Sequence, residues 1–138
     1  IAGADIDLAN NKPALALKTL QEALLLNPDS VSLRLYAARA ATLNQQGKLS
    51  LMWLEPLSHT RPEDPIVWQA LIEAYQQLKD GLGVLRARAE YEFLLGKGEK
   101  ALKDLEQAVV MAKNNYSLMA KIEQRKADIQ EVMAIEKK

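Results

Sequence analysis

Apolar residues recur along the chain at the spacing of helices. From Pro13 to Asn27 they lie three or four positions apart, at Ala14, Leu17 and Leu20, which places them on one face of a helix. Similar stripes follow, divided by short breaks rich in Pro, Gly, Asn or Asp, at residues 31–43, 48–59, 66–78, 82–95, 99–113 and 117–136. With the helical start "IAGADIDLAN", the pattern predicts about eight helices, and the short connections predict antiparallel neighbours.

Two of the breaks repeat one arrangement. Pro28 and Pro62 lie 34 residues apart, and an acidic residue follows each of them. The helices before them share a small residue, then a large apolar residue, then a third packing residue: Ala16, Leu20 and Ala23 in the first copy, and Ser50, Leu54 and Leu57 in the second. This period and spacing are typical of the second helix of a tetratricopeptide repeat (TPR).

The helix after Pro62 carries the pattern of the first helix of such a repeat. Trp68, Leu71 and Tyr75 stand at the expected positions, with Ile72 where the repeat usually has glycine. These aromatic positions belong to the packing pattern of the repeat, so we expect Trp68 and Tyr75 to be core residues rather than exposed binding aromatics.

The repeat then loses its phase. The next copy of the second-helix pattern is Ala101, Leu105 and Ala108, and it begins 51 residues after Ser50, which is one and a half repeats. The helix at 82–95 must therefore serve two repeats. We predict one all-α TPR solenoid over residues 1–138, with units at about 1–30, 31–64, 65–97 and 82–115 and a long C-terminal capping helix at 117–136.

Composition narrows the classes of partner. The 18 basic and 18 acidic residues cancel, which argues against a nucleic-acid footprint. No apolar run approaches the roughly 18 residues of a membrane span. The absence of cysteine excludes disulfides and Cys-ligated zinc, but it leaves the cellular compartment open. Proteins or extended peptides remain as the expected partners.

No residue set in the chain predicts catalysis. His59 is the single histidine, and it has no second His or Cys at ligand spacing, so we expect no metal site. The glycine pairs at 81–83 and 96–98 lack the strand and the Lys-Ser/Thr of a phosphate-binding loop and are interpreted as helix breaks. We expect no catalytic residue and no cofactor within these 138 residues.

The second half of the chain resembles a known family. The residues that carry the resemblance are Arg88-Ala89-Glu90-Tyr91, Leu95-Gly96-Lys97, Glu99-Lys100-Ala101-Leu102, Leu105, and Ala120, Ile122 and Ile129 in the final helix. They look like the C-terminal TPR domain of BepA-like periplasmic zinc metalloproteases, which also act as chaperones of outer-membrane protein assembly. The similarity covers most of residues 60–135. It implies an N-terminal HExxH zinc protease domain that degrades stalled substrates, while this chain contains no HExxH.

In a TPR solenoid the first helices of the repeats line a concave wall, where partners bind. The outward positions of those helices in this sequence are Asp5, Tyr36, Arg39, Leu43, Gln69, Glu73, Gln76, Arg86, Glu90 and Phe93. Polar side chains flank apolar ones in this set, which suits an extended peptide or loop. A plain solvated face is an equally good interpretation of any single residue among them.

Two functions remain open from the sequence. The first is the recruiting domain of a periplasmic metalloprotease, which binds substrates, the outer-membrane assembly machinery or its own protease domain. The second is a free-standing cytoplasmic TPR adaptor. Ile1 reads as the middle of a helix, so we expect the chain to be part of a longer protein that covers an apolar face around Ala2, Ile6 and Ala9. A signal peptide and HExxH upstream of Ile1 would favour the first function.

Overall fold

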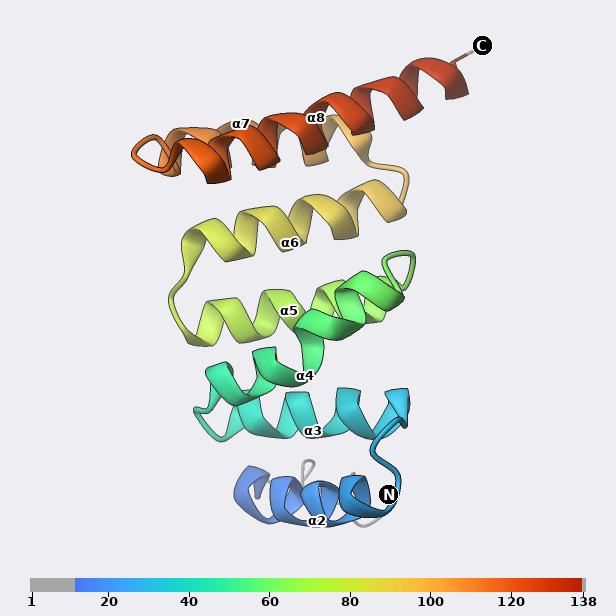
Figure 1. Cartoon of the computed structure of the whole chain (residues 1–138), viewed down its shortest axis with the longest axis vertical. Helices are drawn as coiled ribbons and strands as arrows, with labels where there is room; N and C mark the ends of the chain where they lie inside the picture. Colours follow the sequence, from blue (N-terminus) through green and yellow to red (C-terminus); the bar gives the residue numbers. More distant parts are fainter. Residues whose placement is uncertain (1–11, 138) are drawn as a thin grey trace.

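The computed structural model describes residues 12–137, which form seven α-helices and contain no strand. Figure 1 shows the helices stacked along the long axis of the molecule, numbered from α2. In chain order they are α2 (Pro13–Leu26), α3 (Val31–Leu43), α4 (Gly47–Thr60), α5 (Pro65–Gln77), α6 (Gly81–Leu94), α7 (Gly98–Met111) and α8 (Tyr116–Glu136). The predicted all-α stack is confirmed. The helix predicted at the start of the chain, with Ala2, Asp5, Ile6 and Ala9, lies outside the described residues.

Local sequence signals set the helix ends. In each of four helices a side-chain oxygen accepts a hydrogen bond from a backbone N–H of the first turn: Ser30 caps α3, Asp64 caps α5, Asp80 caps α6 and Asn115 caps α8. The break after α6 is made at Gly96, whose φ of 80° is the left-handed conformation that glycine adopts without steric cost. The predicted breaks therefore mark real changes of direction.

The buried side chains form three clusters along the stack. Fully buried alanines such as Ala40, Ala74 and Ala89 let neighbouring helices approach closely, and leucine and isoleucine fill the remaining space. The first cluster lies around Leu17 and Leu20, the second around Leu54, Leu57 and Leu71, and the third around Leu105, Ile122 and Ile129. Each cluster is made by successive helices, as a repeat arrangement requires.

Helix α6 has an unusual place in the stack. Its broad contacts are with α5 and α7, while α4 packs on α3 and α5, and α8 packs on α7. In Figure 1, α4 and α8 lie in front of these neighbours, and no helix lies in front of α6. This contact pattern accords with a helix shared by two units. The TPR assignment and the unit boundaries stay predictions.

Helix α8 is the longest, at 21 residues, but only Ile122 and Ile129 are buried in it. A side-chain clamp adds to this small apolar contact. Arg125 donates two hydrogen bonds to Glu90 of α6, Nε to Oε2 and Nη2 to Oε1, both at 2.7 Å. Its guanidinium also lies 5.5 Å from the centre of the Phe93 ring. This clamp of Arg125 and Glu90 joins α8 directly to α6, in addition to the packing of both helices on α7.

Candidate functional site

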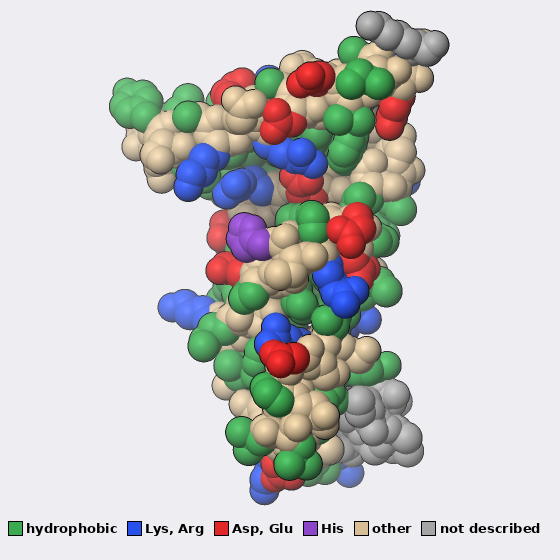
Figure 2. Space-filling view, turned by 45° about the vertical axis from the view of Figure 1, so that its right-hand side comes forward, with side chains coloured by type: hydrophobic (Ala, Val, Ile, Leu, Met, Phe, Trp, Pro, Cys, Tyr) green, Lys and Arg blue, Asp and Glu red, His purple; other side chains and the backbone are tan. Residues whose placement is uncertain are grey.

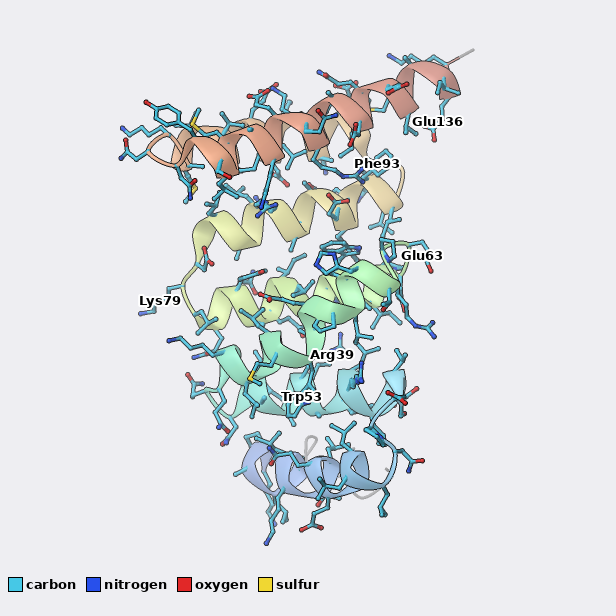
Figure 3. The ribbon with its side chains drawn as sticks, in the orientation of Figure 1. Arg39, Trp53, Glu63, Lys79, Phe93 and Glu136 are labelled. Carbon is cyan, nitrogen blue, oxygen red and sulfur yellow. The ribbon has the colours of Figure 1, made fainter. Side chains whose placement is uncertain are left out.

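The predicted residues of α3 and α5 lie together. Arg39 and Leu43 of α3 and Glu73 of α5 line one hollow of about 430 Å³. Arg39 Nε lies 3.5 Å from Glu73 Oε1, and about two-fifths of each side chain is exposed. Tyr36 lies one turn before Arg39 on the same helix and is 36% exposed, but it does not line this hollow. Figure 3 shows Arg39 in the middle of the stack.

A second hollow, of about 380 Å³, continues from the first across α5 and α6. Glu73 lines both hollows, so they form one surface. The second hollow adds the predicted Gln69 and Gln76 of α5, and from α6 it adds Arg88, Tyr91 and Glu92. We call this surface the polar wall; its residues are Arg39, Leu43, Gln69, Glu73, Gln76, Arg88, Tyr91, Glu92 and Lys97.

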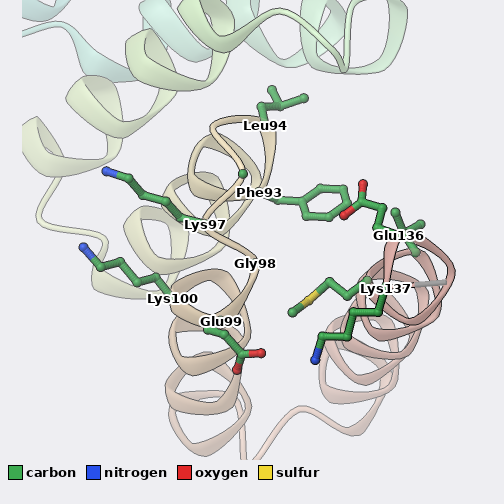
Figure 4. A pocket seen from close by; sticks show the side chains of 11 residues that line it. Phe93, Leu94, Lys97, Gly98, Glu99, Lys100, Glu136 and Lys137 are labelled. Carbon is green, nitrogen blue, oxygen red and sulfur yellow. The ribbon is translucent and has the colours of Figure 1, made fainter.

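The three predicted residues of α6 lie elsewhere. Arg86 and Glu90 line a separate hollow with residues of α4 and α5. Phe93 lines a hollow of about 890 Å³ between the α6–α7 turn and the end of α8. Figure 4 shows Phe93 pointing towards Glu136, on the other side of α7 from Lys97 and Lys100. The structure therefore does not join Arg86 and Glu90 to the polar wall, whereas the hollow of Phe93 shares Lys97 with it.

Sequence reasoning missed Arg88, Tyr91 and Glu92 because it assigned one exposed face to α6. Helices on both sides of α6 bury Leu85, Ala87 and Ala89, so the helix has an exposed strip on each flank. Arg86 and Arg88, two positions apart, fall on opposite strips because consecutive residues turn by about 100°. The alternation of Arg and Ala from Arg86 to Ala89 was the available signal.

Three ionisable groups meet at the α6–α7 contact. Arg88 donates from Nε to Asp104 Oδ2 at 3.0 Å and from Nη2 to Asp104 Oδ1 at 3.1 Å, and Asp104 is 9% exposed. Glu92 Oε1 is buried and has no hydrogen-bond partner among the described residues. Burial, followed by a hydrogen bond to Asp104, raises the pKa of Glu92 to about 7. Protonated Glu92 can donate to Asp104, and ionised Glu92 cannot.

The pKa of the Asp104 carboxyl shifts in the opposite direction to that of Glu92. Burial alone raises its pKa, but the hydrogen bonds from Arg88 and Glu92 outweigh burial, and the net direction is downward. Asp104 therefore stays ionised and paired with Arg88, while Glu92 holds the proton of the cluster.

The Glu92 carboxyl predicts a pH dependence of stability. Its pKa is about 4.5 normally and about 7 in the fold, so between these values the folded state holds a proton that the unfolded state releases. Stability is expected to fall as the pH rises through this window. Glu92→Gln replaces the carboxyl O–H donor by an amide N–H donor and cannot ionise, so it should be more stable than the parent at pH 8 by about 1 kcal/mol, after allowance for solvent screening.

Urea unfolding at pH 5 and pH 8 measures this effect. Glu106→Gln, which removes an exposed carboxylate of α7, is the matched control and should follow the parent at both pH values. An identical change between the two pH values in the parent and in Glu92→Gln would show that Glu92 does not hold the proton.

The remaining chemistry of the described residues is sparse. Between residues 12 and 137 no three His, Cys, Asp or Glu side chains are grouped as metal ligands would be. Within the same range no helix has the length and apolar character needed to cross a membrane. His59 is an exposed residue near the end of α4.

The described helices and the polar wall define a class of structure, an α-helical repeat stack with a charged, hollowed surface. No protein-family model matches the chain. The chain is 35% identical over 111 residues to the beta-barrel assembly-enhancing protease of Yersinia pestis. The match covers 79% of this chain, and the chain spans 22% of the length of that protein. The resemblance to this kind of protease, predicted from the sequence, is confirmed.

Proposed function

We propose that this chain is a protein-interaction module that recruits substrate or partner proteins through the polar wall. The parent protein would be a periplasmic metalloprotease that acts in outer-membrane protein assembly and quality control. The observation that carries the proposal is the 35% identity, over 79% of the chain, to a protease named for enhancing β-barrel assembly. The TPR assignment belongs to the same proposal, because TPR solenoids bind peptides and loops along their inner helices.

The ion pairs of the structure differ in a way that suits this role. The Arg88–Asp104 and Arg125–Glu90 pairs are bidentate, with distances of 2.7–3.1 Å, and they fix helices to one another. The Arg39–Glu73 pair has one contact of 3.5 Å, and Arg39 Nε makes no hydrogen bond within residues 12–137. Among the paired charges of the wall, Arg39 and Glu73 are therefore those that a partner can engage at the smallest cost.

The other wall residues provide the chemistry that an extended segment needs. Gln69 and Gln76 are exposed and carry both donors and acceptors for a peptide backbone. Leu43, in the adjoining hollow of the wall, is 56% exposed and offers an apolar contact for a partner side chain. Polar groups for the backbone and apolar contacts for side chains are the two requirements of peptide recognition.

In this proposal proteolysis takes place in another part of the longer protein. Zinc hydrolysis needs about three protein ligands and a base, which residues 12–137 do not group together. Zinc would therefore be held by a separate catalytic domain. The chain would present substrates to that domain or connect it to the outer-membrane assembly machinery.

Exchanging the charges of Arg39 and Glu73 tests the proposal. Arg39→Glu combined with Glu73→Arg preserves an opposite-charge pair, so the melting temperature should stay within a few degrees. Recovery of partner proteins from envelope extract by the full-length protein should fall at least about tenfold, which corresponds to about 1.4 kcal/mol. Quantitative mass spectrometry of the recovered proteins gives the readout.

The matched control exchanges an exposed pair on α2, Lys18→Glu with Glu22→Lys, and should recover partners as the parent does. Equal recovery by the Arg39/Glu73 exchange and the α2 exchange would remove the polar wall as the binding surface.

A further inference from the structure

A third hollow, of about 270 Å³, lies on the flank of α6 that faces away from the polar wall. Three helices contribute to it. The residues that define it are Ser58 and His59 of α4, Trp68 and Tyr75 of α5, and Arg86 and Glu90 of α6. Arg86 lines this hollow and Arg88 lines the polar wall, so the two surfaces lie on opposite flanks of α6.

Among the described helices, α2 to α8, none covers α6 on the flank of this hollow. Helices α4 and α8 lie in front of their neighbours, whereas α6 makes its broad contacts with α5 and α7 and has no helix in front of it (Figure 1). The space-filling view shows the molecule narrowed at this level, between α4 and α8 (Figure 2). The hollow thus lies as a groove beside α6, on the flank that no other described helix covers.

The floor of the groove is apolar and aromatic. Trp68 and Tyr75 are only partly buried, while Leu71 and Ala87 beside them are 2% exposed. Trp68 Nε1 donates to the Pro62 carbonyl at 2.8 Å, so the indole is held in place where it lines the hollow. Fixed aromatic rings at the base of a groove are typical anchor sites for partner side chains.

The charged side chains at the rim of the groove differ in whether they have an ion-pair partner. Both carboxylate oxygens of Glu90 accept hydrogen bonds from Arg125. Arg86 is exposed, and no carboxylate between residues 12 and 137 lies within ion-pair distance of it. Glu55, also exposed, stands on the α4 side of the hollow. A complementary partner would bring a carboxylate to Arg86 and a hydrogen-bond donor to Glu55.

We propose that this groove docks an amphipathic helix of a partner protein. The helix would insert an apolar or aromatic side chain between Trp68 and Tyr75 and place a carboxylate against Arg86. A helix fits better than a strand because all the walls are helices, which offer no unpaired strand edge, and because the uncovered flank of α6 lies between helices α4 and α8. This site is independent of the polar wall, since it lies on the other flank of α6.

The test begins with capture at the groove. A photoreactive side chain replaces His59 in the full-length protein, and another replaces Lys48 on the same helix as a control. The cross-linked segment is sequenced and synthesised, and its affinity is measured by calorimetry. We expect His59, and not Lys48, to capture a segment of another protein that is helical when bound and carries apolar residues with carboxylates one turn apart.

Two variants then test the contacts. Arg86→Glu should weaken binding of the synthetic peptide at least about tenfold, and Arg86→Gln should weaken it less. Ser58→Trp, which fills the hollow, should abolish binding. Lys18→Glu on α2 makes the same charge change as Arg86→Glu at a distant exposed position and should leave the affinity unchanged.

Several results would overturn the proposal. In the capture experiment, these are a cross-link to the same polypeptide or to a second copy of it, or no cross-link from the photoreactive side chain at position 59. In the sequenced segment, it is the lack of helical spacing between apolar residues. In the binding experiment, it is a peptide that binds Arg86→Glu as tightly as the parent. If Arg86→Glu does not fold, the comparison of Arg86→Gln with the parent decides the charge contact.

Discussion

Replacing Leu54 by alanine is expected to lower the free energy of unfolding by about 2–5 kcal/mol. Leu54 has no exposed surface and lies in the cluster that joins α3, α4, α5 and α6. Truncation leaves a cavity where helices from successive units meet, and the surrounding backbone can fill it only partly. Equilibrium unfolding in urea, followed by circular dichroism, measures the loss.

Met52→Ala is the control for Leu54→Ala. Met52 lies on the same helix and is 72% exposed, so its replacement should change stability by less than about 0.5 kcal/mol. If both variants lost the same small amount of stability, the second core cluster would not hold the stack together.

Replacing Arg125 by alanine is expected to cost about 1.5–3 kcal/mol, the range for hydrogen bonds to charged groups. The change leaves both oxygens of Glu90 without their donors, and the Glu90 side chain is only 17% exposed. The effect should be large for one polar residue because α8 buries only Ile122 and Ile129. Urea unfolding gives the total, and hydrogen exchange should show faster opening of α8 than of α5.

A double-mutant cycle with Glu90→Gln separates the pair from other effects of the substitution. Coupling of at least about 1 kcal/mol is expected between the two positions. Glu123→Ala removes a 54% exposed partner in an ion pair within α8 and should cost less than about 0.5 kcal/mol. Additive effects of Arg125→Ala and Glu90→Gln would mean that the clamp does not hold α8.

Local patterns predicted the helices well because their causes are local. The 3.6-residue stripe gave α3 its bounds, and the Asp, Ser, Asn and Gly residues at the breaks act in the structure as caps and turns. The 51-residue interval also predicted that the helix at 82–95 serves two repeats, and this assignment stays a prediction.

Local sequence patterns could not predict which residues of different helices contact one another. Glu90 and Arg125 are 35 residues apart, and neither periodicity nor motif links them. Trp68 was predicted as a core residue; it packs against the second core cluster but is only partly buried, because it also lines the hollow beside α6. The predicted residues of α6, Arg86, Glu90 and Phe93, line other hollows than the residues of α3 and α5, because α6 is packed on two sides and has two exposed flanks. In each case the deciding fact is where a distant helix lies.

The central claim is that partner proteins bind at the polar wall, and the most direct measurement is site-specific photo-crosslinking in cells that express the full-length protein. Photoreactive side chains replace Gln69 and Gln76, which are exposed on the wall, and Glu22, which is exposed on α2. The account predicts that both wall positions cross-link to the same partner proteins and that Glu22 does not. Cross-links from Glu22, with none from Gln69 or Gln76, would contradict it.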